Sequence, residues 1–168
     1  MRFVDSSIFI KWGRSTVSEA LQDAEVSLCG YILSKIKDGE ETMTSSLVKD
    51  EVLIWFSRYQ ASRLEDFIRS LIALTHIEVV YPTLEDELEA TRLYAKYPLG
   101  ISDLINYSIM KRYDIHEIYS TDKGLDKVPE VKRVFEELKD EPQYHDFIAE
   151  LGRRGHGLHN PRNRSTPD

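Results

Sequence analysis

The chain begins with MRFVDSSIFIKW (residues 1–12), and this stretch decides the fold class. A short strand-like run, Arg2–Val4, leads directly to Asp5, and two hydroxyl residues and further apolar residues follow. A carboxylate at the end of a buried strand costs free energy unless a partner compensates its charge. The sequence therefore has to supply a partner for Asp5 elsewhere in the chain.

Further strand-like runs alternate with longer helical patterns along the chain. Apolar residues at helical spacing, with hydroxyl or acidic residues at the starts, mark the helices. This alternation predicts an α/β fold of three layers, α/β/α, around a central parallel sheet of four to five short strands. The expected strands are Arg2–Val4, Glu41–Thr44, Ile77–Tyr81 and Glu117–Ser120. The expected helices are Val17–Lys37, Leu47–Tyr59, Ser62–Leu74, Thr83–Lys96, one capped by Ser102 and ending near Tyr113, Pro129–Lys139, and one starting at Pro142; Val131–Val134 is also compatible with an edge strand.

Length and composition predict one domain of residues 1–150 followed by a tail of residues 151–168. The tail carries four arginines against one aspartate and has no periodicity, so we expect it to be basic and disordered. The whole chain has a net charge of −7, which argues against indiscriminate nucleic-acid binding. The single cysteine, Cys29, excludes an intramolecular disulfide and a cysteine-rich zinc site.

The sequence gives no sign of a membrane span or of secretion. No run approaches the roughly 20 apolar residues that a transmembrane helix needs. Asp5 interrupts the apolar run at the N-terminus, so no signal peptide is expected. We therefore expect a soluble, cytoplasmic protein.

Four acidic residues are predicted to meet at one edge of the sheet. Asp5 and Asp122 follow strands, and Asp103 lies in the first turn of a helix. Strand carboxyl ends and helix N-termini share one edge of a parallel α/β sheet, where ligand sites form. Glu51 is four residues from both Leu47 and Trp55, so we expect it on the buried face of its helix.

Each acid also has a purely structural interpretation. Asp5 fits a helix cap, Asp103 complements a helix dipole, and Asp122 lies in a Ser-Thr-Asp-Lys-Gly turn sequence. Glu51 fits a buried salt bridge. Four converging carboxylates without an obvious basic cluster would nevertheless repel one another, and a divalent cation resolves this conflict. Oxygen ligands alone favour Mg²⁺ or Mn²⁺ over zinc.

These features together resemble the PIN domain family, which includes RNA-cleaving toxins of the virulence-associated protein C (VapC) type. The resemblance rests on Asp5 after a short strand, Glu51 in a middle helix, Asp103 in Ile-Ser-Asp-Leu-Ile, and the late Ser-Thr-Asp-Lys-Gly-Leu-Asp, and covers about residues 1–140. It implies an Mg²⁺- or Mn²⁺-dependent ribonuclease, with an antitoxin protein as a possible partner. The implied catalytic residues are Asp5, Glu51, Asp103, Asp122 and Ser120, and the implied metal ligands are Asp5, Glu51, Asp103, Asp122 and Asp126.

The resemblance also implies cleavage of RNA phosphodiester bonds that leaves a 5′-phosphate and a 3′-hydroxyl. Lys11, Arg14, Lys49, Lys123 and Lys127 are candidates for phosphate contacts. Trp12, Trp55 and Tyr59 are candidates for stacking on bases, although packing explains Trp55 and Tyr59 as well. The apolar Leu53–Phe56 segment, together with the neighbouring helix, favours a homodimer.

Three other functions remain to be compared with the nuclease. A catalytically silent PIN fold would bind RNA or a protein with the same acids in structural roles. A phosphate-receiver domain needs an acceptor Asp after a middle strand, where this chain has Val-Tyr-Pro-Thr. A dinucleotide-binding domain needs a Gly-rich motif after the first strand, and none is present.

Overall fold

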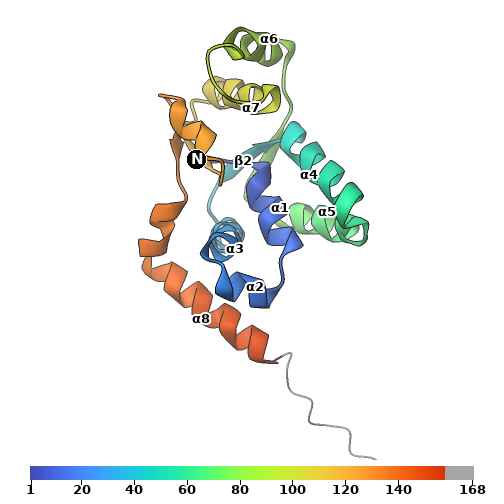
Figure 1. The fold of residues 1–168 in the computed structure, drawn as a ribbon, viewed down its shortest axis with the longest axis vertical. Coiled ribbons are helices and arrows are strands. Elements are labelled where there is room, and N and C mark those ends of the chain that lie inside the picture. Colours follow the sequence, from blue (N-terminus) through green and yellow to red (C-terminus); the bar gives the residue numbers. More distant parts are fainter. Residues whose placement is uncertain (158–168) are drawn as a thin grey trace, which may run out of the picture.

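The computed structural model describes residues 1–157 and has the expected three-layer α/β/α architecture (Figure 1). Its central sheet is entirely parallel, with five strands in the order β3-β2-β1-β4-β5. The strands are β1 (Arg2–Val4), β2 (Thr42–Ser45), β3 (Ile77–Val80), β4 (Glu117–Tyr119) and β5 (Lys132–Arg133).

The helices lie on both sides of this sheet, with α6 and α7 on one side and α1 and α3 on the other (Figure 1). The three central strands, β2, β1 and β4, are thereby largely buried, and Phe3 and Tyr119 are fully inaccessible. The α-helices are α1 (Ser6–Arg14), α2 (Val17–Gln22), α3 (Ala24–Lys37), α4 (Ser46–Tyr59), α5 (Leu64–Ala73), α6 (Leu84–Leu93), α7 (Ile101–Arg112) and α8 (Pro142–Gly157), and the 3₁₀ helices are η1 (Ala61–Arg63), η2 (Lys123–Lys127) and η3 (Glu136–Asp140).

The strand order defines where a site can form. From β1 the chain adds β2 and β3 on one side, and it then crosses to add β4 and β5 on the other. The carboxyl ends of β1 and β4 therefore flank the topological switch point, where open α/β sheets bind ligands. In the β1–β4 register Val4 lies opposite Tyr119, so Asp5 and Ser120 leave the sheet side by side.

The expected helix Val17–Lys37 is wrong as a single element, because it divides at Asp23. The Asp23 backbone N–H closes α2 on the Glu19 carbonyl, and its side chain accepts a 2.8 Å hydrogen bond from the Glu25 N–H at the start of α3. The apolar periodicity continues through this break, so the sequence pattern did not reveal the break. The expected end of α3 is confirmed, since Gly39 has a φ of +116°.

The expected helix Pro129–Lys139 is also wrong, and the alternative edge strand is correct. Lys132 and Arg133 form β5, which pairs with β4, and η3 follows. The apolar residues at helical spacing, Val131, Val134 and Phe135, are buried by the sheet and its surroundings rather than by one helix face. Backbone pairing with β4 determined the structure here, against the local pattern.

Two boundaries differ from expectation. The helix expected to be capped by Ser102 starts two residues earlier, after Gly100, because the Asp103 carboxylate accepts the Gly100 N–H. The tail expected from residue 151 begins inside α8, which runs from Pro142 to Gly157. Leu151 is buried against Ala20 and Val26 of α2 and α3. The rest of the expected tail, residues 158–168, lies outside the described residues.

No helix within residues 1–157 is both long enough and apolar enough to cross a membrane.

Candidate metal and nuclease site

Asp5 occupies the centre of the candidate site at the carboxyl end of β1. Its side chain is 9 % exposed, and its Oδ2 caps α1 by accepting the Ser7 N–H at 3.3 Å. The same oxygen accepts the hydroxyl groups of Ser7 at 2.6 Å and Ser120 at 2.8 Å. Within the described part of the chain, Oδ1 has no hydrogen-bond donor and remains available to a ligand.

Asp103 and Asp122 use one carboxylate oxygen each in the same way. Asp103 Oδ2 accepts the Gly100 N–H at 3.1 Å, and Asp122 Oδ1 accepts the Gly124 N–H at 2.8 Å. Both contacts agree with the structural interpretations of these acids, in which Asp103 lies at a helix N-terminus and Asp122 in a turn. In residues 1–157 the second oxygen of each carboxylate has no donor, so capping and ligand binding are compatible at both positions.

Electrostatic coupling links Asp103 to the other three acids. Burial is the largest cause that raises the pKa of the Asp103 carboxyl to about 6. The negative charges of Asp5, Asp122 and Glu51 raise this pKa as well, whereas the hydrogen bond from Gly100 lowers it. Three other acids, from three other parts of the chain, therefore act on the Asp103 carboxyl group.

Glu51 differs from the expectation in one respect, because its side chain is exposed. The buried stripe of α4 consists of Val48, Val52 and Phe56, at a spacing of four residues. Glu51 lies beside this stripe and lines an open groove with Trp55 and Tyr59 of the same helix. Glu51 is four residues from both Leu47 and Trp55, but this spacing does not bury it, because those two residues are themselves only partly buried.

Asp126 differs from the other four acids in that it forms an ion pair. Its carboxylate accepts the Nε of Arg133 at 2.9 Å and a second guanidinium nitrogen at 3.3 Å. Asp126 therefore already has a cationic partner. In contrast, the described residues place no Lys, Arg or His nitrogen within 4.0 Å of the carboxylates of Asp5, Glu51, Asp103 or Asp122.

Ser7 contacts one candidate site residue, and Asn106 is buried one helical turn after a second one; sequence reasoning singled out neither. The Ser7 hydroxyl donates to Asp5 and accepts the Thr121 N–H at 3.1 Å, so it links the ends of β1 and β4. Asn106 is 4 % exposed, and its Oδ1 accepts the Ser45 hydroxyl at 2.6 Å. The signals for them were the hydroxyl residues directly after Asp5 and the position of Asn106 one helical turn after Asp103.

The donor set fits a hard divalent cation. It consists of carboxylate oxygens, several of which have no donor or counter-charge within residues 1–157, and such oxygens suit Mg²⁺ or Mn²⁺. No three His, Cys, Asp or Glu side chains of the described residues lie close enough together to form a ready-made metal cage. Mutual repulsion of the carboxylates favours such spacing.

Of the expected phosphate-binding residues, two are engaged in ion pairs. Lys11 pairs with Glu25, and Lys49 pairs with Asp50. Arg14, Lys123 and Lys127 have no carboxylate oxygen within 4.0 Å in the described residues. These three remain candidates for contacts to a nucleic-acid backbone.

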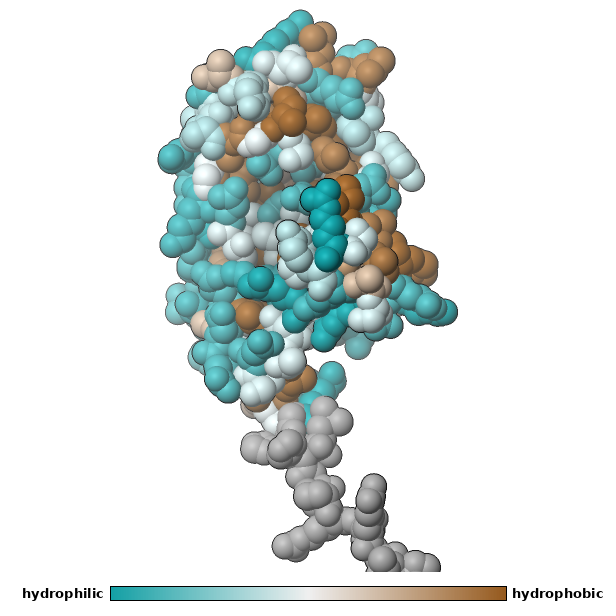
Figure 2. Space-filling model, turned by 45° about the vertical axis from the view of Figure 1, so that its right-hand side comes forward, coloured by the Kyte–Doolittle hydropathy of each residue, from teal (hydrophilic) through white to brown (hydrophobic). Residues whose placement is uncertain are grey.

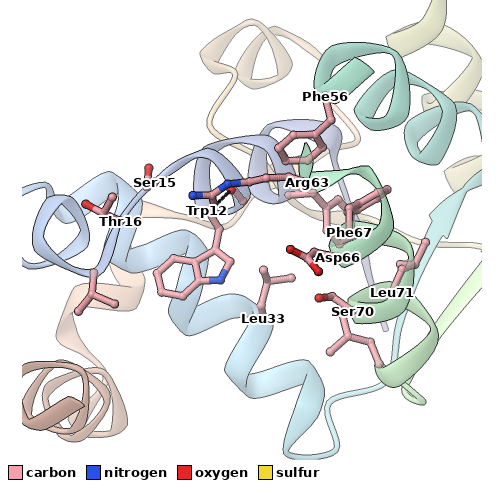
Figure 3. A pocket seen from close by; sticks show the side chains of 14 residues that line it. Trp12, Ser15, Thr16, Leu33, Phe56, Arg63, Asp66, Phe67, Ser70 and Leu71 are labelled. Atoms are coloured by element: carbon pink, nitrogen blue, oxygen red, sulfur yellow. Dashed lines mark hydrogen bonds between the residues drawn. The ribbon is translucent and has the colours of Figure 1, made fainter. Parts of the chain in front are cut away.

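A separate cavity of about 260 Å³ lies between α1 and α5, away from the acids (Figure 3). Trp12, Phe56 and Phe67 form much of its apolar wall, and the Arg63 guanidinium donates to the Gly13 carbonyl at its rim. Trp12 also contacts Phe147 of α8, with ring centroids 6.3 Å apart. Trp12 therefore belongs to the packing between helices, and its expected role in base stacking has no support from this position.

Comparison with known proteins supports the same fold. The sequence profile of the PIN domain family matches residues 2–131. Among curated proteins no sequence match was found. Solved structures with a similar fold include the Mycobacterium tuberculosis toxin VapC20, described as cleaving the sarcin-ricin loop, with a TM-score of 0.58 and 19 % identity over 73 % of this chain and 90 % of that one.

Two further similar structures are complexes. A toxin–antitoxin complex from Klebsiella pneumoniae has a TM-score of 0.58 and 15 % identity over 79 % of this chain and 96 % of that one. The VapBC2 complex from Rickettsia felis, bound to a DNA fragment from its promoter, has a TM-score of 0.57 and 14 % identity over 80 % of this chain and 98 % of that one. At these identities the similarity shows the fold alone.

Proposed function

Because this chain belongs to the PIN domain family, we propose that it is a metal-dependent endoribonuclease with a centre formed by Asp5, Glu51, Asp103 and Asp122. One observation carries the proposal: three other acids act on the Asp103 carboxyl, and no basic side chain of the described residues compensates any of the four. Such a cluster is costly in a folded protein unless it binds a cation.

The residues of the chain have separate roles in this proposal. Asp5, Asp103 and Asp122 would hold Mg²⁺ or Mn²⁺ through the oxygens that the caps leave free, and Glu51 would complete the set from its exposed position. A bound cation would supply positive charge for the phosphodiester group and acidify an attacking water. Ser120 and Ser7 hold the Asp5 carboxylate in one orientation.

The experiment that tests this function is cleavage of single-stranded RNA by the purified protein. We expect cleavage with Mg²⁺ or Mn²⁺, none in EDTA, and products with a 5′-phosphate and a 3′-hydroxyl. RNA that is bound in the presence of Mg²⁺ but never cleaved would instead favour the catalytically silent module. The acids would then have structural roles only.

We further propose that the protein acts as the toxin of a toxin–antitoxin pair. The support is the fold that it shares with chains from two such complexes. Expression of the chain alone is then expected to arrest growth. Co-expression of a neighbouring open reading frame should relieve the arrest, and co-purification of its product would identify the antitoxin.

A homodimer is proposed as well, through a face different from the expected one. In the Leu53–Phe56 segment, Phe56 is only 1 % exposed whereas Ile54 is 50 % exposed, so this segment buries only part of its apolar surface within the chain. The α6 helix instead presents Leu84 and Leu88, which are 78 % and 52 % exposed and lie one turn apart. A self-complementary apolar stripe of this kind suits a symmetric dimer.

A further inference from the structure

We propose that a groove on α4, beside the candidate metal site, binds a nucleobase of the RNA substrate. The inference rests on the proposed nuclease function and adds a binding subsite to it. The groove has a volume of about 320 Å³ and is lined by Ile10, Glu51, Ile54, Trp55, Arg58 and Tyr59. It lies on the α4–α5 side of the molecule, which Figure 2 turns toward the viewer.

The aromatic side chains of this groove form a surface that is already in place. Trp55 and Tyr59 follow Glu51 at a spacing of four residues, so the three side chains lie in a row along α4. The two rings are 5.1 Å apart between centroids and inclined by 43°. Trp55 packs edge-to-face on Phe56, with ring centroids 5.3 Å apart, whereas Tyr59 remains 68 % exposed.

This row begins at a candidate metal ligand. Glu51 itself lines the groove, and Trp55 lies one helical turn further along α4, a rise of about 6 Å. An RNA strand with a phosphodiester group at the acids would therefore have a neighbouring base within reach of Trp55 and Tyr59. Aromatic rings accept any base, since every base has a π-face.

The charges of the groove favour a nucleotide over a second copy of the chain. Arg58 has no carboxylate oxygen within 4.0 Å among residues 1–157, so its guanidinium is available to a phosphate. A protein interface over this groove would bury the charges of both Glu51 and Arg58, which is costly without partners. A planar base covers the rings and leaves both charged groups at its edges, open to water, metal or phosphate.

The test compares Tyr59 variants in RNA binding, with Asp5→Asn present in every protein so that the RNA stays intact. Tyr59→Leu keeps the apolar bulk but loses the aromatic face, and should weaken binding of an unpaired oligoribonucleotide about tenfold. Tyr59→Phe keeps the ring and should bind like the parent. Tyr94→Leu is the matched control: Tyr94 is 59 % exposed at the end of α6, and its replacement should leave the affinity unchanged.

A second probe isolates the base itself. Fluorescence anisotropy with an oligomer that lacks single bases should show a position at which base removal weakens the parent but not Tyr59→Leu. If Tyr59→Leu binds like the parent while the wild-type protein cleaves RNA, the subsite is wrong and the nuclease stands. If the wild-type protein neither binds nor cleaves RNA, both the subsite and the nuclease function are refuted. If Tyr59→Leu changes only the sedimentation coefficient, the groove is a contact between copies.

Discussion

The Ser120 hydroxyl donates a 2.8 Å hydrogen bond to Asp5 Oδ2, although the two residues are 115 positions apart in the sequence. Ser120 also accepts the N–H of Asp122 at 3.0 Å, so one buried hydroxyl connects two of the four acids. The β1–β4 register creates this relationship, because Val4 and Tyr119 lie opposite each other one residue earlier.

Replacement of a central acid should abolish metal-dependent cleavage without unfolding the protein. Asp5→Asn or Asp103→Asn should lower the cleavage rate by on the order of 100-fold or more, because each removes a carboxylate that the cation needs. Rates with Mg²⁺ and the far-ultraviolet circular dichroism of each variant check this. Asp126→Asn is the control and should cleave nearly normally, since Asp126 pairs with Arg133. Wild-type rates in Asp5→Asn would refute the assignment.

Ser120→Ala should weaken the site through Asp5. The Ser120 hydroxyl is fully buried and orients the Asp5 carboxylate, so its loss should reduce Mn²⁺ affinity by about 10- to 100-fold. Isothermal titration calorimetry measures this affinity independently of cleavage. Cleavage should recover at high Mn²⁺ concentration, which a purely catalytic role of Ser120 would not allow. Ser108→Ala is the control, because the buried Ser108 hydroxyl bonds only the Leu104 carbonyl of its own helix.

Stability at neutral pH should depend on Asp86, outside the candidate site. Burial opposes ionisation of Asp86, but hydrogen bonds from Thr83 and the Arg112 charge outweigh it and lower its pKa. The stabilisation is present above the unfolded-state pKa of about 3.9 and is lost as pH falls through the lower folded-state pKa. Asp86→Asn should therefore cost about 1–2 kcal/mol at pH 7.

Urea unfolding at pH 7 and at pH 3 measures this difference, which should shrink at the lower pH. Glu89→Gln serves as the control. Glu89 forms a more exposed pair with Lys111 at 3.4 Å, so its replacement should change the free energy of unfolding by less than about 0.5 kcal/mol. Equal effects of the two variants at pH 7 would contradict the role of Asp86.

Truncation should show where the folded domain ends. Removal of residues 151–168 deletes the buried Leu151, which packs on Ala20 and Val26. We expect a loss of about 2 kcal/mol, or about 4–8 °C in melting temperature. Leu151→Ala in the full chain should reproduce most of this loss. Removal of residues 158–168 alone leaves every buried residue described here in place, and should scarcely change the melting temperature.

The proposed dimer should dissociate when charge enters the α6 stripe. Leu88→Glu places a carboxylate among exposed apolar side chains, which a self-complementary interface would have to bury unpaired. Analytical ultracentrifugation at micromolar concentration should show a dimer for the wild type and a monomer for this variant. Ile72→Glu, on the 75 % exposed Ile72 of α5, should stay dimeric. Dissociation by Ile72→Glu alone would move the interface to α5.

Local patterns in the sequence were enough for the layers of the fold and for the region of the site. Alternating strands and helices imply a parallel sheet, and chain direction then places strand ends and helix starts at one edge. The sequence therefore predicts that Asp5, Asp103 and Asp122 lie at the same edge of the sheet, because each lies directly at a strand end or a helix start. The match to the PIN domain family agrees with this.

Features that depend on contacts between distant residues are visible only in the tertiary structure. Helical spacing predicts which face of α4 carries Glu51, but the exposure of Glu51 depends on neighbours that the spacing does not reveal. Likewise, the sequence does not show that Asp126 pairs with Arg133, because β5 brings these two residues together. Lys132 and Arg133, inside the run Val131–Val134, form a strand because they pair with β4. Helix α8 extends past residue 150, where Leu151 packs on α2 and α3. The sequence by itself determined which groups reach the edge of the sheet, since periodicity and chain direction are local properties. Only the packed structure decided which of them are paired, buried or free, since those states depend on residues far away in the chain.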